Sequence, residues 1–334
     1  MKNKCFIHHN IHKAAVLQFP HKDKQKSFSG VLFAAFTIFV WGITFVCTKS
    51  LLHDFSALEI LVVRFLLAYI TLWCLYPHAL HMEHKKDELL FCAAGLSGVT
   101  VYQFLENIAI TFTSASNVSI IVSICPIFAA ITAQIFLHEK HITIFFVIGF
   151  VLAIIGVAFV SFNGALNFHV NPKGDFLALG SAISWGFYTL FVSKINALHF
   201  NKLAITRRIF FYALIWMIPL VLIGAFFPVA KESSLIAVQL DPTINAIRFS
   251  KLLNLINLLF LGIAASALCF AAWNVACERL GSVRATIGIY LIPVVTIVFA
   301  YFALGEKITA MGVVGALLAI CGLVISSIRV QKPV

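Results

Sequence analysis

Residues 107–140 read NIAITFTSASNVSIIVSICPIFAAITAQIFLHEK, and residues 274–307 read NVACERLGSVRATIGIYLIPVVTIVFAYFALGEK. Aligned without gaps at an offset of 167 residues, the two stretches are identical at Asn107, Ala109, Ile120, Pro126, Ala133, Leu137, Glu139 and Lys140. In both, a proline inside an apolar run is followed thirteen residues later by Glu-Lys. One apolar unit is therefore present twice.

The similarity extends outward from these stretches on both sides. Residues 30–42 match 174–186 at an offset of 144, including Trp41-Gly42 against Trp185-Gly186, and residues 145–161 match 311–327 at an offset of 166. Chance similarity between apolar helices would not keep the same order of features. We therefore predict repeats at 28–161 and 174–328, joined by a linker at 162–173. The change of offset by 23 places an insertion at 228–250.

The composition is that of a membrane protein. The chain is 61% hydrophobic and 11% charged, and its mean hydropathy is +0.99. Soluble domains have about 45–50% apolar and about 25% charged residues. A bilayer core needs roughly 20 apolar residues per helix. Ten stretches meet that length: 31–51, 57–76, 89–111, 115–137, 142–161, 174–194, 203–227, 252–277, 283–304 and 308–328. The prediction is an all-α protein of ten transmembrane helices, five in each repeat.

The distribution of basic residues predicts the orientation. With the N-terminus inside, 17 of the 24 lysines and arginines fall on the cytoplasmic side, as the positive-inside rule requires. Both termini, including a basic tail at 1–27 and a short tail at 329–334, are therefore predicted to be cytoplasmic, with 228–250 outside. Five spans per repeat make the second copy inverted. The net charge of +11 then reports topology and contact with anionic lipid, not nucleic-acid binding.

Motifs for catalysis or cofactors are missing. The eight cysteines form no CxxC pair, and the sequence has no Walker A loop, HExxH or GxSxG. We expect no cofactor and no metal, and we do not expect an enzyme.

The two five-span units, the Trp-Gly in each first helix and the proline followed by Glu-Lys in each fourth helix resemble the drug/metabolite transporter superfamily. Within it, they resemble the ten-span bacterial EamA-type carriers. The resemblance covers about residues 28–328 and is poor for substrate. It implies a secondary carrier in the bacterial inner membrane that moves a small metabolite, an amino acid or a drug-like solute, with export as the direction by analogy.

The first helix of each repeat carries a candidate pathway face. Thr37, Trp41, Thr44 and Thr48 share one helix face, and Ser181, Trp185, Tyr188 and Val192 occupy the equivalent face. Such a face suits a pocket for an amphipathic solute. Helix–helix packing through small polar residues is the alternative.

Ionisable residues inside spans are the sharpest signals, because each costs at least about 2.5–3.5 kcal/mol at mid-bilayer unless it is paired or hydrated. Glu106, with Gln103 and Asn107 on the same face, lies at a depth similar to that of Arg64. Glu106 is a candidate proton-coupling group, and a permanent Arg64–Glu106 ion pair is the alternative. Glu106 has no acidic mate, since Trp273 occupies that position.

Pro126 and Pro293 are candidate hinges, or simple packing kinks. Asn117, Ser123, Asn274 and Tyr290 complete the predicted substrate pathway. Glu139-Lys140 and Glu306-Lys307 are expected to have structural roles at helix ends, and Arg208 to snorkel to the cytoplasmic interface. Gly149, Gly156, Gly315 and Gly322 predict close helix packing or a dimer surface.

Duplicated membrane units commonly build a pathway at the interface between the copies. We therefore expect alternating access of a small solute, in a monomer or homodimer embedded in lipid. A non-transporting receptor or scaffold of the same fold is the alternative, and it predicts a dry interface between the repeats. An intramembrane enzyme is the least favoured hypothesis.

Overall fold

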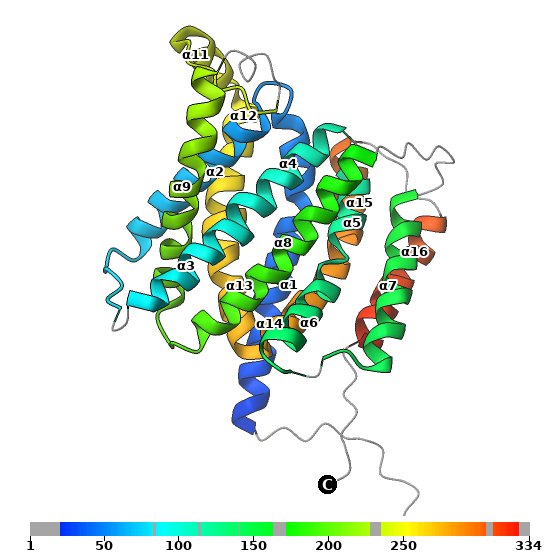
Figure 1. Ribbon diagram of the computed structural model, residues 1–334. Helices are drawn as coiled ribbons and strands as arrows, with labels where there is room; N and C mark the ends of the chain where they lie inside the picture. The colour runs from blue at the N-terminus through cyan, green and yellow to red at the C-terminus, as the bar shows by residue number, and fades with distance from the viewer. Residues whose placement is uncertain are drawn as a thin grey trace, which may run out of the picture.

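The computed structural model describes residues 21–82, 85–112, 115–139, 141–162, 172–227, 235–304 and 310–326. Within these ranges the chain is helical and has no strand, as expected (Figure 1). The predicted linker and the tail at 329–334 lie largely or wholly outside the described residues. Helix α1 begins at His21, so the part of the predicted N-terminal tail nearest the membrane is already helical.

The first repeat begins with α1 (His21–Leu51) and α2 (Ala57–Leu75). Its third span is one long helix whose middle is π-helical: η1 (Lys85–Asp87), α3 (Glu88–Ala94), η2 (Gly95–Val101) and α4 (Tyr102–Phe112). The fourth span is broken into α5 (Ala115–Val122) and α6 (Cys125–Phe136), and α7 (Ile144–Phe162) is the fifth.

The second repeat has the same order. Helices α8 (Pro172–Asn196) and α9 (Lys202–Phe226) are followed by α11 (Pro242–Ser250), which belongs to the predicted insertion. The third span consists of α12 (Leu252–Leu259), π-helical η3 (Phe260–Leu268) and α13 (Cys269–Leu280). The last two spans are α14 (Ser282–Ile287), η4 (Gly288–Leu291) and α15 (Ile292–Leu304), then α16 (Ala310–Ser326).

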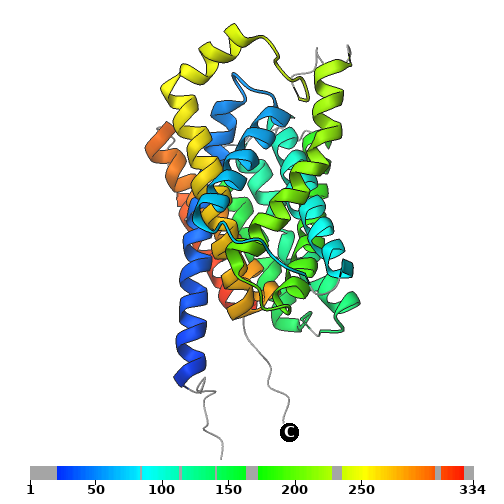
Figure 2. The ribbon, with the colours of Figure 1, turned by 90° about the vertical axis from the view of Figure 1, so that its left-hand side faces the viewer.

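Six of these helices are long and apolar enough to cross a membrane: Ser27–Leu51, Ala57–Leu75, Lys85–Phe112, Pro172–Asn196, Lys202–Phe226 and Leu252–Leu280. Four further apolar helices are shorter, at Cys125–Phe136, Ile144–Gly156, Ser282–Thr296 and Val313–Ser326. The chain is thus a multi-pass membrane protein, and the count of ten spans remains a prediction. The first turns of α1 project from one end of the bundle, and α11 lies across the opposite end (Figures 1 and 2).

The duplicated Trp-Gly pair has a structural explanation in how the repeats interlock. The first helix of each repeat packs against the third and fourth spans of the other, α1 on α13 and α15 and α8 on α4 and α6. A Cβ atom at Gly42 would lie 2.6 Å from Val295, and one at Gly186 would lie 2.8 Å from Phe128. Phe128 and Val295 are themselves matching positions. Each glycine therefore lets two helices from different repeats cross at close range.

The fifth helices of the two repeats, α7 and α16, pack against each other beside the main bundle (Figure 1). A Cβ at Gly149 or Gly156 would lie 2.3 Å from the backbone of α16, and one at Gly322 would lie 2.5 Å from the backbone of α7. The predicted small-residue packing is confirmed, and it occurs within one chain.

Candidate functional site

Six aromatic side chains fill the space where the two repeats meet. This central aromatic layer consists of Trp41, Tyr102, Trp185, Tyr188, Phe270 and Trp273, all at most 8% exposed. The matching tryptophans Trp41 and Trp185 touch edge to face, with ring centroids 5.4 Å apart. Trp273 lies 5.1 Å from Trp41 and 6.0 Å from Trp185. Two predicted pathway faces are thus brought together, and both are buried.

The two matching indoles are bonded differently. Trp41 Nε1 donates to the carbonyl of Ala265 in η3 at 2.9 Å. Trp185 Nε1 is buried and has no hydrogen-bond partner among the described residues. The position in η2 that matches Ala265 is Gly98, and it packs so closely on Tyr188 that a Cβ there would lie 2.0 Å from the ring. The aromatic layer is therefore symmetric in its residues but not in its hydrogen bonds.

Both third spans widen into a π-helix at matching positions, next to this layer. A π-helical turn leaves carbonyls without the regular helical partner, and such turns are common at functional sites. Here they receive side-chain donors from the other repeat: Ser184 donates to the Ser97 carbonyl at 2.7 Å, as Trp41 does to Ala265. Sequence periodicity carried no signal for these turns, because a π-turn does not alter an all-apolar pattern.

Arg64 is only 1% exposed. Its Nε donates to Ser266 Oγ at 2.6 Å, and an Nη donates to Gln103 Oε1 at 2.7 Å. Glu106 is 5% exposed, lies close enough to interact electrostatically with Arg64, and is hydrogen-bonded to Tyr102. Among the described residues, Arg64 and Glu106 do not form an ion pair. The cation is instead held between the repeats by neutral partners.

The matching asparagines hold the third spans in place. Asn107 Nδ2 donates to the Ala57 carbonyl at 3.2 Å, and Asn274 Nδ2 donates to Thr206 Oγ1 at 2.8 Å. Each therefore ties a third span to the second span of its own repeat. Neither side-chain carbonyl has a partner among the described residues, nor do the hydroxyls of Tyr188 and Tyr290. Buried polar groups are nearly always bonded, so these atoms are candidate contacts for a solute or for water.

The remaining predicted pathway residues are less uniform. Pro126 follows the break between α5 and α6, and Pro293 lies at the start of α15, directly after η4. Ser123 is buried beside the first break. Thr44 donates to the Trp41 carbonyl of its own helix at 2.7 Å, which leaves less of its hydroxyl for a solute. The side chain of Asn117 lies outside the described residues, as do Lys140, Glu306 and Lys307.

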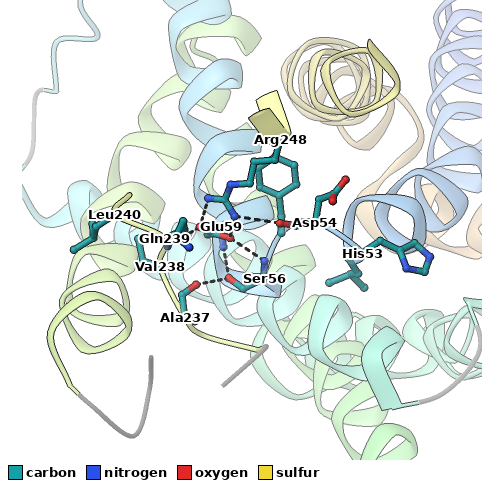
Figure 3. A pocket seen from close by; sticks show the side chains of 11 residues that line it. His53, Asp54, Ser56, Glu59, Ala237, Val238, Gln239, Leu240 and Arg248 are labelled. Atoms are coloured by element: carbon teal, nitrogen blue, oxygen red, sulfur yellow. Dashed lines mark hydrogen bonds and ion pairs between the residues drawn. The ribbon is translucent and has the colours of Figure 1, made fainter. Parts of the chain in front are cut away.

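One end of the bundle carries a network of charged groups that the sequence analysis missed. Glu59 of α2 and Arg248 of α11 pair at 2.6 Å (Figure 3), and Glu59 also accepts from the backbone of Ser56 and Gln239. Lys251 pairs with Asp54 at 2.6 Å. A pocket of about 410 Å³ opens beside these groups. The Ser56-x-x-Glu59 spacing, a capping box that the structure confirms, was the available signal.

Asp54 lies between α1 and α2, outside the spans. Hydrogen bonds from Lys251 first, and then from Asn254, hold the pKa of its carboxyl below the usual value, with the Lys251 charge adding to the effect. The network therefore contains ionised groups that are paired in the folded state.

The opposite end, predicted to be cytoplasmic, carries its own ion pairs. Arg208 pairs with Glu88, which also accepts from the Tyr212 hydroxyl at 2.7 Å. Arg208 is thus bound to a carboxylate of the first repeat, where snorkelling had been expected. Its neighbour Arg207 donates to the carbonyls of Tyr76 and His78 after α2.

This end also has a pocket, which lies between the repeats. We call it the inner pocket; it has a volume of about 170 Å³ and lies between the end of α6, the last turns of α8 and the α13–α14 turn. Its polar lining includes Glu139, His141, Thr189, Ser193, Ser282 and Arg284. Glu139 accepts from His141 at 2.5 Å. Gly281, at φ +89°, makes the sharp turn on its wall.

The sequence model of the EamA-like transporter family matches this chain twice, at residues 28–162 and 172–328. An uncharacterized transporter of Archaeoglobus fulgidus is 25% identical over 303 residues, covering 89% of this chain and 97% of that protein. A probable amino-acid metabolite efflux pump of Salmonella typhimurium is 28% identical over 298 residues, covering 88% and 93%. A probable terminal-alkyne amino-acid exporter of Streptantibioticus cattleyicolor is 24% identical, covering 88% and 91%.

The fold is also found among solved structures. A crystal structure matches with a TM-score of 0.66 over 90% of this chain and 96% of that one, at 14% sequence identity. At that identity the likeness bears on the fold alone.

Proposed function

Because this chain belongs to the EamA-like transporter family, we propose that it is a secondary carrier that moves a small organic solute by alternating access between its two repeats. The resemblance to drug/metabolite transporters is confirmed by that match. The solute class to test first is amino acids and their metabolites, with export as the direction, because the Salmonella and Streptantibioticus relatives are named for those activities. The proposed location is the bacterial inner membrane, with both termini in the cytoplasm.

The observation that carries the proposal is the contact between matched tryptophans of the two repeats, which lie buried in the core. Inverted repeats commonly place a solute site at their interface. Next to this contact lie two π-helical turns, and Trp185 and Tyr188 each have a buried polar atom with no hydrogen-bond partner among the described residues. The aromatic layer would act as the barrier that opens toward either side.

The pockets described above lie toward the two ends, and the aromatic rings between them are packed against one another. The proposal interprets this as a conformation closed at the layer. A receptor or scaffold would have the same dry centre, so the discriminating result is functional. Proteoliposomes preloaded with a panel of unlabelled amino acids should accumulate the corresponding labelled one, and a scaffold would not.

Proton coupling through Glu106 is the second part of the proposal. Glu106 is a buried carboxylate near Arg64 but not paired with it, so gain or loss of its proton would change the net charge of the centre. Glu106→Gln should keep solute exchange but lose the pH dependence of transport driven by a proton gradient. Equal pH dependence in both proteins would contradict the coupling role and leave the carrier function standing.

A further inference from the structure

We propose that the inner pocket is a separate loading site that binds a zwitterionic solute, one with a carboxylate and an ammonium group, before it reaches the central aromatic layer. The inference rests on the proposed carrier function and adds a place and a chemical class to it. It is carried by the position of the pocket, by the charges on its walls and by its size.

The pocket lies on the line between the repeats. Ala129 lies in the fourth span of the first repeat and Glu139 just after its end, Thr189 lies in the first span of the second repeat, and Arg284 in its fourth. Thr189 is one helical turn, about 6 Å, from Trp185, and its hydroxyl donates to the Trp185 carbonyl at 2.9 Å. A solute in this pocket would therefore be directly next to the barrier.

The walls carry opposite charges on opposite repeats. Arg284 is exposed and has neither a hydrogen bond nor an ion pair among the described residues, so its guanidinium is free to bind a carboxylate with two hydrogen bonds. Across the pocket, Glu139 is bonded to His141 through one oxygen. Half of its side chain is exposed, which leaves the other oxygen to accept from an ammonium group.

The rest of the lining suits a small amphipathic molecule. Hydroxyls of Ser193 and Ser282 stand beside the apolar side chains of Leu137, Leu190 and Val283. The volume of about 170 Å³ is enough for several water molecules, and so for a molecule the size of an amino acid. If Arg284 served only to orient the chain in the membrane, as a basic residue of a cytoplasmic loop, it would not need to line a pocket between the repeats.

The test uses three probes of one size: leucine, isoamylamine, which lacks the carboxylate, and 4-methylpentanoate, which lacks the amine. Binding of each to the full-length purified chain is measured by isothermal titration, for the wild type and for Arg284→Gln, Glu139→Gln and Arg279→Gln. Arg279 is the matched control, because it lies nearby on α13 but donates to Ser29 and does not line the pocket.

We expect leucine to bind more tightly than either analogue. Glutamine at this position keeps one N–H donor but loses the charge and the second hydrogen bond. Arg284→Gln should therefore weaken binding of leucine and 4-methylpentanoate about tenfold or more and leave binding of isoamylamine unchanged. Glu139→Gln should weaken leucine and isoamylamine and leave 4-methylpentanoate unchanged. Arg279→Gln should change none. A circular-dichroism melt of each variant shows whether it is folded.

Three results would overturn the loading site. The first is that the wild type binds none of the three probes, and the second is that Arg284→Gln and Arg279→Gln weaken binding equally. The third is that Arg284→Gln or Glu139→Gln abolishes binding of all three probes together. Counterflow with the same proteins separates the two proposals. Solute exchange that is insensitive to Arg284→Gln would remove the loading site and leave the carrier. Binding of leucine with the expected charge pattern, but without any exchange, would keep the site and remove the carrier function.

Discussion

The two repeats start from one sequence pattern, and the structure shows which of its features they share and which they do not. Shared features build the bundle: Gly42 and Gly186 allow the close crossings, and Asn107 and Asn274 anchor the third spans. The features that differ are electrostatic. The first repeat buries Arg64 and Glu106. In the second repeat Trp273 occupies the position that matches Glu106, and Arg208, the match of Arg64, pairs with Glu88 at one end of the bundle. The comparison teaches that symmetry supports the fold and that asymmetry is where coupling is to be sought.

The largest difference should appear when the two matched arginines are replaced. Arg64→Met would leave Gln103 and Ser266 without their donor and Glu106 without a nearby cation, which should cost about 3–5 kcal/mol. Arg208→Met removes a partly exposed ion pair and should cost about 1 kcal/mol or less. Unfolding midpoints in detergent measure both. Equal losses would contradict the asymmetry, and adding Glu106→Gln to Arg64→Met should recover part of the loss.

The matched glycines should behave alike. Gly42→Ala and Gly186→Ala each force a methyl group into a helix of the other repeat, so each should destabilise the chain by about 1–3 kcal/mol. Gly180→Ala on α8 is the control, because its Cβ would meet only the end of Leu105, at 3.2 Å. If one of the two matched glycines tolerates alanine while the other does not, the crossings are not equivalent.

The variants Trp41→Phe and Trp185→Phe should differ in stability by the value of one hydrogen bond. Trp41→Phe leaves the Ala265 carbonyl without its donor, whereas Trp185→Phe loses no bond made to the described residues. The first variant should therefore be less stable than the second by about 1 kcal/mol, measured in the same unfolding assay. The opposite order would mean that the indole hydrogen bond is misassigned.

The smallest effect concerns the network of Glu59, Arg248, Asp54 and Lys251 at one end of the bundle, which has no counterpart in the repeat pattern. Because the pKa of Asp54 is lowered in the folded state, its contribution is present above the unfolded pKa, about 3.9. That contribution is lost as the pH falls through the folded value. Asp54→Asn should thus be slightly less stable than the wild type at neutral pH, by less than about 1 kcal/mol, and equal to it in strong acid. A difference that persists in acid would assign the effect to packing.

Much of this fold could be predicted, because duplication and apolar length are written along the chain. The shared helix faces that carry Trp41 and Trp185, and the close packing at Gly149, Gly156 and Gly322, followed from spacing alone. That α7 and α16 are each other's packing partners did not. The partners of Arg64 did not, because Ser266 lies in the other repeat and single-sequence spacing carries no information across it. The Glu59–Arg248 pair was missed for a related reason: Arg248 lies in the 228–250 insertion, which has no matching segment to compare.

The most direct test of the central claim is amino-acid counterflow in proteoliposomes that contain the wild type, Trp185→Phe or Trp73→Phe. Trp185 lies in the aromatic layer, whereas Trp73 is 42% exposed, near one end of α2. The account predicts accumulation by the wild type and by Trp73→Phe, and an exchange rate reduced about tenfold in Trp185→Phe, the loss of roughly 1.4 kcal/mol of solute interaction. Accumulation that is equal in all three proteins, or absent from all three, would contradict it.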